Sequence, residues 1–432
     1  MNGDTVELTH LASVADELAK CAKCGECRSV CPVFAHGGRE RHVARGKLGL
    51  AEAVRTGELG LSDAFDEVAN NCLLCLACVS NCGSGVRVDR VIRAARADLA
   101  SHRGLPAFKR LIFRMLAEGR GGMNFLSRSG SLFQYLLFRR IPHTSGLRRR
   151  FPLPWMDKDR YLPALSSKPF LSRISDARPS GDPVDTVLLF TGCSVNYMFP
   201  HIAEAVTSVL TKLGVRVIVP VDQMCCGTMA DVGGDRETAK LLARKNLSLF
   251  TSGELPYKIV TPCSSCGYTL SHGYQELMAG DDQWSEKALN VAECVYDISR
   301  YLIQEIGPER IAARLTKPFP GKVTYHDPCH LKRGQGVSAE PRQLLKLACG
   351  GGFVEMNEAD RCCGSGGLYG LTHRRTSLNI LSRKIENMAE TEAATAATGC
   401  PACLVQLQEG IINSKLDITP LHTIEILDRC LE

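Results

Sequence analysis

The chain has 432 residues, of which 44% are hydrophobic and 23% charged, and its formal net charge is +6. This composition is ordinary for a globular protein and excludes a chain that is disordered throughout. No apolar run approaches the roughly 18 residues of a membrane-spanning helix, so we do not expect an integral membrane protein. The first ten residues lack the basic start and apolar core of a secretory signal, which favours a cytoplasmic location.

The chain contains 21 cysteines, and this number narrows the class of protein to which it can belong. A disulfide framework is not expected in a chain of this length without an export signal, since the cytosol keeps thiols reduced. Many cysteines in a reducing compartment indicate metal binding instead. The spacing of the cysteines then indicates which metal.

A predicted helix over residues 8–20 leads into a first cysteine run, C-x2-C-x2-C-x3-C-P, at residues 21–32. The same spacing returns with an offset of 51 residues (72 − 21), and Gly83 replaces the proline. This run is typical of two-cluster ferredoxins, in which the fourth cysteine of each run ligates the other cluster. The spacing therefore predicts one [4Fe-4S] cubane on Cys21, Cys24, Cys27 and Cys82, and a second on Cys72, Cys75, Cys78 and Cys31.

Zinc is the alternative metal for C-x2-C pairs. A zinc site closes with four ligands and has no use for the third and fourth cysteines of each run, so two complete runs favour iron–sulfur clusters. Helical patterns at residues 61–70 and 86–102 complete a mostly helical ferredoxin module, which we expect to span residues 1–102.

Residues 103–182 form a connecting segment of different composition. Residues 103–178 contain 16 Lys and Arg against four Asp and Glu, a net charge of +12, together with ten of the 26 aromatic residues. Two interpretations stay open: an interdomain strap with solvated or paired arginines, or a surface that meets an anionic membrane or a quinone. No nucleic-acid-binding motif accompanies the charge, so no nucleic-acid partner is expected.

From residue 183 the pattern becomes α/β and repeats. Strands are predicted at 185–190, 215–219 and 258–261, and helices at 202–213 and 236–250. A strand at 322–325 begins a second copy, whose cysteines follow those of the first at offsets of 136 or 137 residues. We expect domains at 183–320 and 321–432, packed with pseudo-twofold symmetry, and so an α+β multidomain fold for the whole chain.

Each copy supplies five cysteines at strand ends, where open α/β sheets place their sites. The first set is Cys193, Cys225, Cys226, Cys263 and Cys266, and the second is Cys329, Cys362, Cys363, Cys400 and Cys403. Five sulfurs exceed the need of a cube with four irons, which suggests open or unusual clusters. The three remaining cysteines, Cys294, Cys349 and Cys430, are expected to be small buried hydrophobes.

Groups near these cysteines are expected to tune the clusters. His326, His330 and His373 are interpreted as hydrogen-bond partners of sulfur or backbone rather than as ligands. The glycine-rich stretch 364–367 does not match a dinucleotide loop. Its glycines are interpreted as leaving room for the backbone to lie close to a cluster. Its N–H groups should raise the potential of the second set, whereas Asp231 should lower that of the first.

The paired C…CCG…CxxC pattern resembles the cysteine-rich, or CCG, domain. This domain occurs in heterodisulfide reductase and in the iron–sulfur subunits of glycolate oxidase, D-lactate dehydrogenase and anaerobic glycerol-3-phosphate dehydrogenase. One ferredoxin module followed by two CCG units is similar to these dehydrogenase subunits, and stretches 325–331, 362–373 and 422–427 most resemble the glycolate oxidase subunit. Because complete five-cysteine sets bind non-cubane [4Fe-4S] clusters in heterodisulfide reductase, the resemblance implies up to two further clusters here.

The resemblance also implies a function. The chain would take electrons from an FAD-containing subunit that oxidises glycolate or D-lactate, and would pass them to a quinone or a soluble carrier. No residue is assigned to substrate catalysis. Members of the dehydrogenase branch often lack one CxxC cysteine, whereas this chain keeps all ten, so a heterodisulfide-reductase-like catalytic subunit stays open as the alternative. The expected location is cytoplasmic or peripheral on the inner face of the cell membrane.

Overall fold

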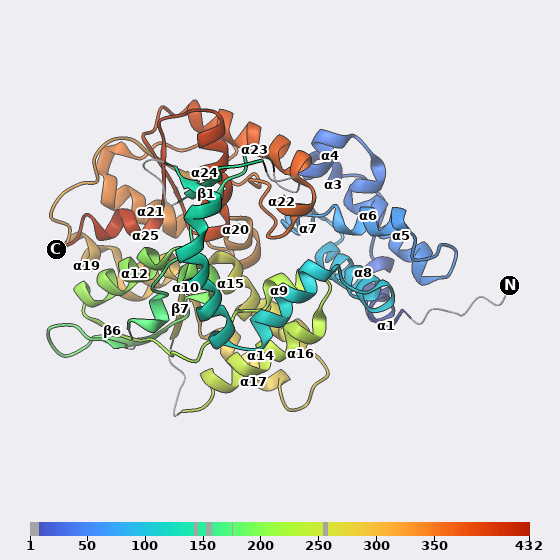
Figure 1. Ribbon diagram of the computed structural model, residues 1–432, viewed down its shortest axis with the longest axis horizontal. Coiled ribbons are helices and arrows are strands. Elements are labelled where there is room, and N and C mark those ends of the chain that lie inside the picture. Colours follow the sequence, from blue (N-terminus) through green and yellow to red (C-terminus); the bar gives the residue numbers. More distant parts are fainter. Residues whose placement is uncertain (1–7, 142–145, 153–156, 158, 175, 254–257) are drawn as a thin grey trace. The chain divides into compact units, whose positions relative to one another are not determined.

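The computed structural model of the protein describes residues 8–141, 146–152, 157, 159–174, 176–253 and 258–432 (Figure 1). It contains two compact units. The helical unit consists of Met1–Arg114, Gly227–Ala239 and Cys362–Leu381, and the sheet unit consists of Met115–Cys226, Lys240–Arg361 and Ser382–Glu432. The four-domain division expected from the sequence stays a prediction.

The helical unit packs short helices against one long helix. Its core joins Leu11, Leu48, Phe65, Val91 and Ala95, which lie on four different helices. The helices are α1 Thr9–Ala12, α2 Ala15–Ala19, α3 Cys27–Val30, α4 Pro32–Gly37, α5 Ala44–Arg55, α6 Asp63–Asn70, α7 Ala77–Ser80, α8 Val88–Arg103, α13 Thr228–Val232 and α22 Tyr369–Thr372.

The predicted helix over residues 8–20 is two helices, α1 and α2, because Val14 leaves the helical region with φ −122° and ψ 22°. The buried carboxylate of Asp98, on α8, accepts the backbone N–H groups of His10 and Leu11 at 3.1 and 2.8 Å. An aspartate supplied by a distant helix therefore caps α1, a contact that local periodicity does not reveal.

The later segments of the helical unit pack on its N-terminal helices. The Arg96 guanidinium donates to the carbonyls of Cys72 and Val232 at 2.6 and 2.8 Å, and the hydroxyl of Tyr369 donates to Asn71 Oδ1 at 2.7 Å. Residues 227–239, which follow the first CC pair, and residues 362–381, which begin with the second, thus share hydrogen bonds with the ferredoxin helices.

The sheet unit contains the two α/β repeats. The first forms a five-stranded sheet in the order β4-β6-β5-β7-β8, in which only the β4–β6 pair is antiparallel, and the second a three-stranded parallel sheet in the order β11-β10-β9. The strands are β4 Asp176–Ala177, β5 Asp185–Leu189, β6 Val215–Ile218, β7 Lys258–Thr261, β8 Val295–Asp297, β9 Val323–His326, β10 Thr395–Thr398 and β11 Thr419–His422. The expected strands agree with the structure to within one residue at each end.

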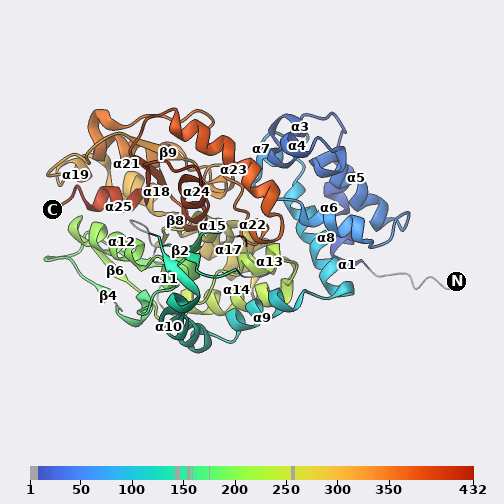
Figure 2. The same ribbon diagram turned by 45° about the horizontal axis from the view of Figure 1, so that its top comes forward.

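The helices of the sheet unit link the two repeats. Helix α15, which carries the first CxxC, packs against α20 of the second repeat, and α24, which carries the second CxxC, packs against α11 of the first. Figure 2 labels most of these helices. They are α11 Gly192–Tyr197, α12 Pro200–Lys212, α15 Ser264–Tyr268, α16 Tyr274–Met278, α17 Ser285–Glu293, α18 Ile298–Tyr301, α19 Pro308–Ala312, α20 Cys329–Gln335, α21 Ala339–Cys349, α24 Pro401–Asn413 and α25 Thr423–Asp428.

One hydrophobic core serves both repeats, since Val187 and Val260 of the first and Val323 and Ala397 of the second belong to the same cluster of buried residues. The expected helices at 202–213 and 236–250 are confirmed as α12 and α14, Arg236–Phe250. Helices α9 (Ala107–Ala117), α14 and α23 (Arg374–Ala389) each contain one boundary between the units.

The connecting segment adds helix α10, Arg120–Leu137, and an antiparallel sheet of β1 Phe138–Arg140, β2 Gly146–Arg149 and β3 Leu162–Pro163. Among the described residues, no helix is both long and apolar enough to cross a membrane.

Candidate iron–sulfur centres

Two cavities in the helical unit are lined by cysteines from both runs. One is bordered by Cys31, Cys72, Cys75 and Cys78, and the other by Cys21, Cys24, Cys27 and Cys82. These sets are the two that the crossed ferredoxin pattern assigns to separate clusters. Four thiols around one cavity form a donor set that fits a [4Fe-4S] cube. The second cavity also reaches Cys78.

The loops that carry these cysteines share an unusual backbone. Lys23 and Gly25 in the first run have φ of 55° and 94°, and Leu74 and Leu76 in the second have φ of 52° and 61°. The two pairs occupy equivalent positions, and three of the four residues are not glycine. Such a conformation is costly for a residue with a Cβ and persists where the surroundings require it. Here it turns the chain sharply between successive cysteines.

A buried lysine borders one of these cavities. Lys47, on α5, is 3% exposed, and its ammonium donates to the carbonyls of His42 and Asn71 at 2.7 and 2.9 Å. Burial raises the pKa of the Cys31 and Cys78 thiols, and the charge of Lys47 opposes both shifts. A cation held at this cavity favours thiolates and a reduced cluster. The burial of Lys47 was not predicted, because a lysine in a polar helix gives no signal of burial.

Sulfur atoms form a continuous chain in the sheet unit. Cys193 and Cys225 lie 3.8 Å apart, sulfur to sulfur, and further thiol hydrogen bonds join Cys225 to Cys226 and Cys226 to Cys266. The chain continues from Cys266 to Cys263, then to Cys400 and Cys403. The first set thus adjoins two cysteines of the second, a connection that the separate repeats in the sequence do not suggest.

The hydrogen bonds between these sulfurs determine which of the thiols keep their protons. Hydrogen bonds from the thiols of Cys263 and Cys403 hold the pKa of Cys400 well below its usual range, and the bond with Cys225 lowers the pKa of Cys193. The pKa values of Cys225 and Cys266, which share bonds with neighbouring cysteines and are buried, lie well above the usual range. Such closely packed buried sulfurs can exchange protons for metal ions, as ligand sets do on metal binding.

A glycine makes the approach of these sulfurs feasible. Gly192 has φ +64°, and a Cβ at this position would lie 2.7 Å from Cys266 Sγ. Any side chain would displace the Cys266 sulfur from its position. A nearby cavity, lined by Cys193 and Cys225 together with Leu116, Met123 and Met224, borders the first set.

The second set divides between the two units. Cys329, Cys400 and Cys403 belong to the sheet unit, whereas Cys362 and Cys363 begin a segment of the helical unit. The N–H of Gly364 lies 3.4 Å from Cys362 Sγ, a contact of the kind expected from the glycine-rich loop. The role expected for Asp231 is weakened, because its carboxylate pairs with Arg93 at 3.2 Å in a buried salt bridge.

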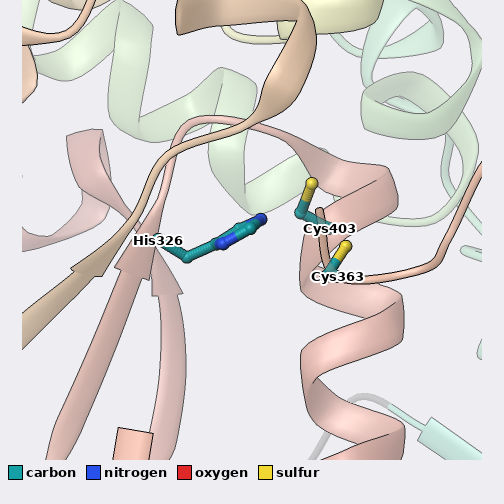
Figure 3. Close-up of side chains that lie close together, drawn as sticks. All are labelled: His326, Cys363 and Cys403. Carbon is teal, nitrogen blue, oxygen red and sulfur yellow. The ribbon is translucent and has the colours of Figure 1, made fainter. Parts of the chain in front are cut away.

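The three histidines differ in their surroundings. The ring of His330 stacks on Tyr268 with centroids 5.0 Å apart and its Nδ1 lies 3.3 Å from Ser265 Oγ, while His373 stacks on Tyr369 at 4.7 Å. His326 is 1% exposed, and Figure 3 shows its ring projecting from the end of β9 toward Cys403.

His422 is a fourth histidine at the site, to which the sequence analysis gave no role. Its Nε2 donates to the Pro262 carbonyl at 2.9 Å and its Nδ1 accepts from the Ile424 N–H at 3.2 Å, so the neutral ring fixes the backbone immediately before Cys263. Burial lowers the pKa of His422 to about 4.

Two of the three cysteines outside the sets are core residues, as expected. Cys349 and Cys430 are buried in the hydrophobic core of the sheet unit, and Cys294 is half-buried.

Comparisons with known proteins identify the domains that carry these cysteines. The cysteine-rich domain model matches residues 187–271 and 323–408, and the 4Fe-4S dicluster domain model matches residues 17–86. The chain is 30% identical over 419 residues to the probable glycolate oxidase iron-sulfur subunit of Bacillus subtilis (strain 168), covering 95% of this chain and 93% of that protein. It is also 30% identical over 245 residues to lactate utilization protein A 2 of Bacillus cereus (strain Q1), covering 57% of this chain and 98% of that protein. The chain belongs to the family of glycolate oxidase-type iron–sulfur subunits.

Proposed function

We propose that this chain is the electron-transfer subunit of a flavin-dependent 2-hydroxy-acid dehydrogenase, with glycolate or D-lactate oxidised on a partner. The observation that carries the proposal is the arrangement of eight cysteines around two adjoining cavities, in the crossed pattern of a two-cluster ferredoxin. Such clusters accept and release single electrons. An FAD subunit would supply electrons in pairs, and this chain would pass them singly to a quinone or a soluble carrier.

The proposal assigns the ligands residue by residue. Cys21, Cys24, Cys27 and Cys82 hold one cubane, and Cys72, Cys75, Cys78 and Cys31 hold the other. The sets at Cys193, Cys225, Cys226, Cys263 and Cys266, and at Cys329, Cys362, Cys363, Cys400 and Cys403, hold up to two further clusters. The continuous sulfur chain in the sheet unit supports loading of the first of these.

The proposal is tested by co-expressing the chain with an FAD-containing 2-hydroxy-acid dehydrogenase subunit from the same genome. We expect the two to copurify, and we expect hydroxy-acid-dependent reduction of a one-electron dye to require this chain. A flavoprotein that never binds the chain and reduces the dye equally well without it would refute the proposal.

A disulfide reductase is the second candidate. Both five-cysteine sets are complete, and a cavity borders Cys193 and Cys225, and these two features favour it. In that case a substrate sulfur would bind at a five-cysteine cluster while the ferredoxin clusters supply electrons. A paramagnetic signal that appears in the oxidised protein only when a thiol substrate is added would favour this candidate. Its absence across a panel of thiols would exclude it.

We further propose that the protein docks on the anionic inner face of the membrane through helix α10. The apolar side chains of this helix face outward: Phe125, Leu132 and Leu136 are 76%, 73% and 66% exposed. Its inward face is polar, and Ser127 donates to the Ser166 carbonyl at 2.8 Å. A helix that buries its polar face and exposes its apolar face needs an apolar partner.

The charge around α10 indicates which partner. Residues 119–156 contain seven arginines and no Asp or Glu. An apolar helix face in a basic segment suits the headgroup region of an anionic bilayer better than an acidic or neutral surface. We expect the protein to float with vesicles that contain phosphatidylglycerol and to remain in the dense fraction when the vesicles are neutral. Equal behaviour with both would contradict the proposal.

A further inference from the structure

Position 326 distinguishes the two α/β repeats. Alignment of Cys193 with Cys329 pairs Phe190 of the first repeat with His326 of the second. Phe190 is 1% exposed, and its ring meets Phe250 edge-on at 5.9 Å. The second repeat therefore places an imidazole where the first places hydrocarbon, at the same distance before the first cysteine of its set.

Within the part of the chain that the structure describes, neither ring nitrogen of the buried His326 makes a hydrogen bond of good geometry, although the Ala359 carbonyl, which accepts the Asp327 N–H at 3.0 Å, lies near the ring. A buried polar group that is left unpaired costs about 1–3 kcal/mol. The first repeat shows that phenylalanine fits the equivalent position of the same fold. An imidazole is therefore expected to serve a purpose here that packing does not require.

The direction of the ring indicates that purpose. A ring nitrogen of His326 and the sulfur of Cys403 lie within 4.8 Å of each other. Figure 3 shows the ring at the end of β9, pointing toward Cys403 at the start of α24. His330 and His422 instead have partners in Ser265 and in the Pro262 carbonyl. Of these three histidines near the cysteines of the sheet unit, His326 alone has no ring hydrogen bond of good geometry, and one of its ring nitrogens lies near Cys403.

We propose that His326 is a positioning and tuning residue of the second five-cysteine cluster, and that its ring N–H donates a hydrogen bond to a sulfur of that cluster. The inference rests on the proposed function, since it requires a cluster on the second set. Five cysteines already exceed the number of ligands that four irons need. His326 is therefore assigned as a hydrogen-bond donor to sulfur and not as an iron ligand. Such a donor stabilises the reduced cluster and raises its reduction potential.

The test compares His326→Phe, which copies the first repeat, with His326→Asn, which keeps an N–H donor. Both are made in a Cys226→Ser background, where the first set is incomplete and its signal is removed. Iron and acid-labile sulfide are measured first, and an anaerobic titration followed by electron paramagnetic resonance then gives the potential. We expect unchanged iron in both variants, and in His326→Phe a reduced-to-oxidised ratio at least tenfold lower at a fixed applied potential, which is 59 mV for one electron.

His326→Asn should recover most of that ratio. Unchanged potentials in both variants, or an equal loss of iron from both, would overturn the inference, because a retained donor would then make no difference. The background protein also tests the proposed function separately: if its iron content accounts only for the two cubanes, the second set holds no cluster, and the proposed loading and this inference both fail.

Discussion

At the scale of single residues, Lys47 is the group that most directly couples the fold to the redox chemistry. Its ammonium is held by two backbone carbonyls beside the cavity of Cys31 and Cys72. We predict that Lys47→Gln lowers the potential of this cubane by on the order of 60 mV, about 1.4 kcal/mol for one electron, because a nearby positive charge is lost. The cubane at Cys21, Cys24, Cys27 and Cys82 is the internal control in the same titration. Equal shifts in both cubanes would show a general structural effect instead.

His422 predicts a pH dependence of stability. The folded protein keeps its pKa at about 4, below the usual 6.5. Between these two pH values the unfolded chain binds a proton that the folded chain does not, so stability falls as the pH decreases through this window. At most about 1.4 kcal/mol is lost per pH unit from this group. Chemical denaturation at pH 7 and pH 5 should show a smaller difference for His422→Asn than for the wild type.

If His422→Asn retained the wild-type difference in the free energy of unfolding between pH 7 and pH 5, the assignment of His422 as a neutral, buried ring would be wrong.

At the scale of elements, α10 is predicted to carry the membrane affinity. The double variant Leu132→Ser/Leu136→Ser should abolish flotation with anionic vesicles, because it removes exposed apolar area without touching the buried polar face. The matched control is Leu289→Ser, which changes a leucine of α17 that is 51% exposed. Moderate salt should release the wild type, since screening at 0.1 M acts over about 10 Å. Flotation that survives the double variant would place the affinity elsewhere.

The elements also show how far the sequence could predict the structure. Period and spacing predicted β5, β7, α12 and α14 closely, because hydrophobic patterns in packed α/β layers are regular. The capping of α1 by Asp98 was not predicted, since Asp98 is more than 80 residues away in the sequence. The burial of Lys47 and the contact of Cys263 with Cys400 were missed for the same reason, as both depend on tertiary packing.

At the scale of the whole molecule, the two compact units predict modular loading. Cys27 belongs to the helical unit and the five cysteines of the first repeat belong to the sheet unit. Cys27→Ser should therefore remove one cubane, about four irons, and leave the signal of the first five-cysteine set intact. Iron analysis and resonance spectra of the purified variant would check this. Simultaneous loss of all clusters would show that the units do not load independently.

Electrons from a hydroxy acid are proposed to enter this chain through a flavoprotein. The most direct measurement is anaerobic rapid mixing of the cluster-loaded chain and its flavoprotein with glycolate or D-lactate, followed by the visible absorbance of the iron–sulfur clusters. We predict that this absorbance bleaches within the turnover time and that the bleaching requires both the substrate and the flavoprotein. Clusters that stay oxidised while the flavin is reduced would contradict it.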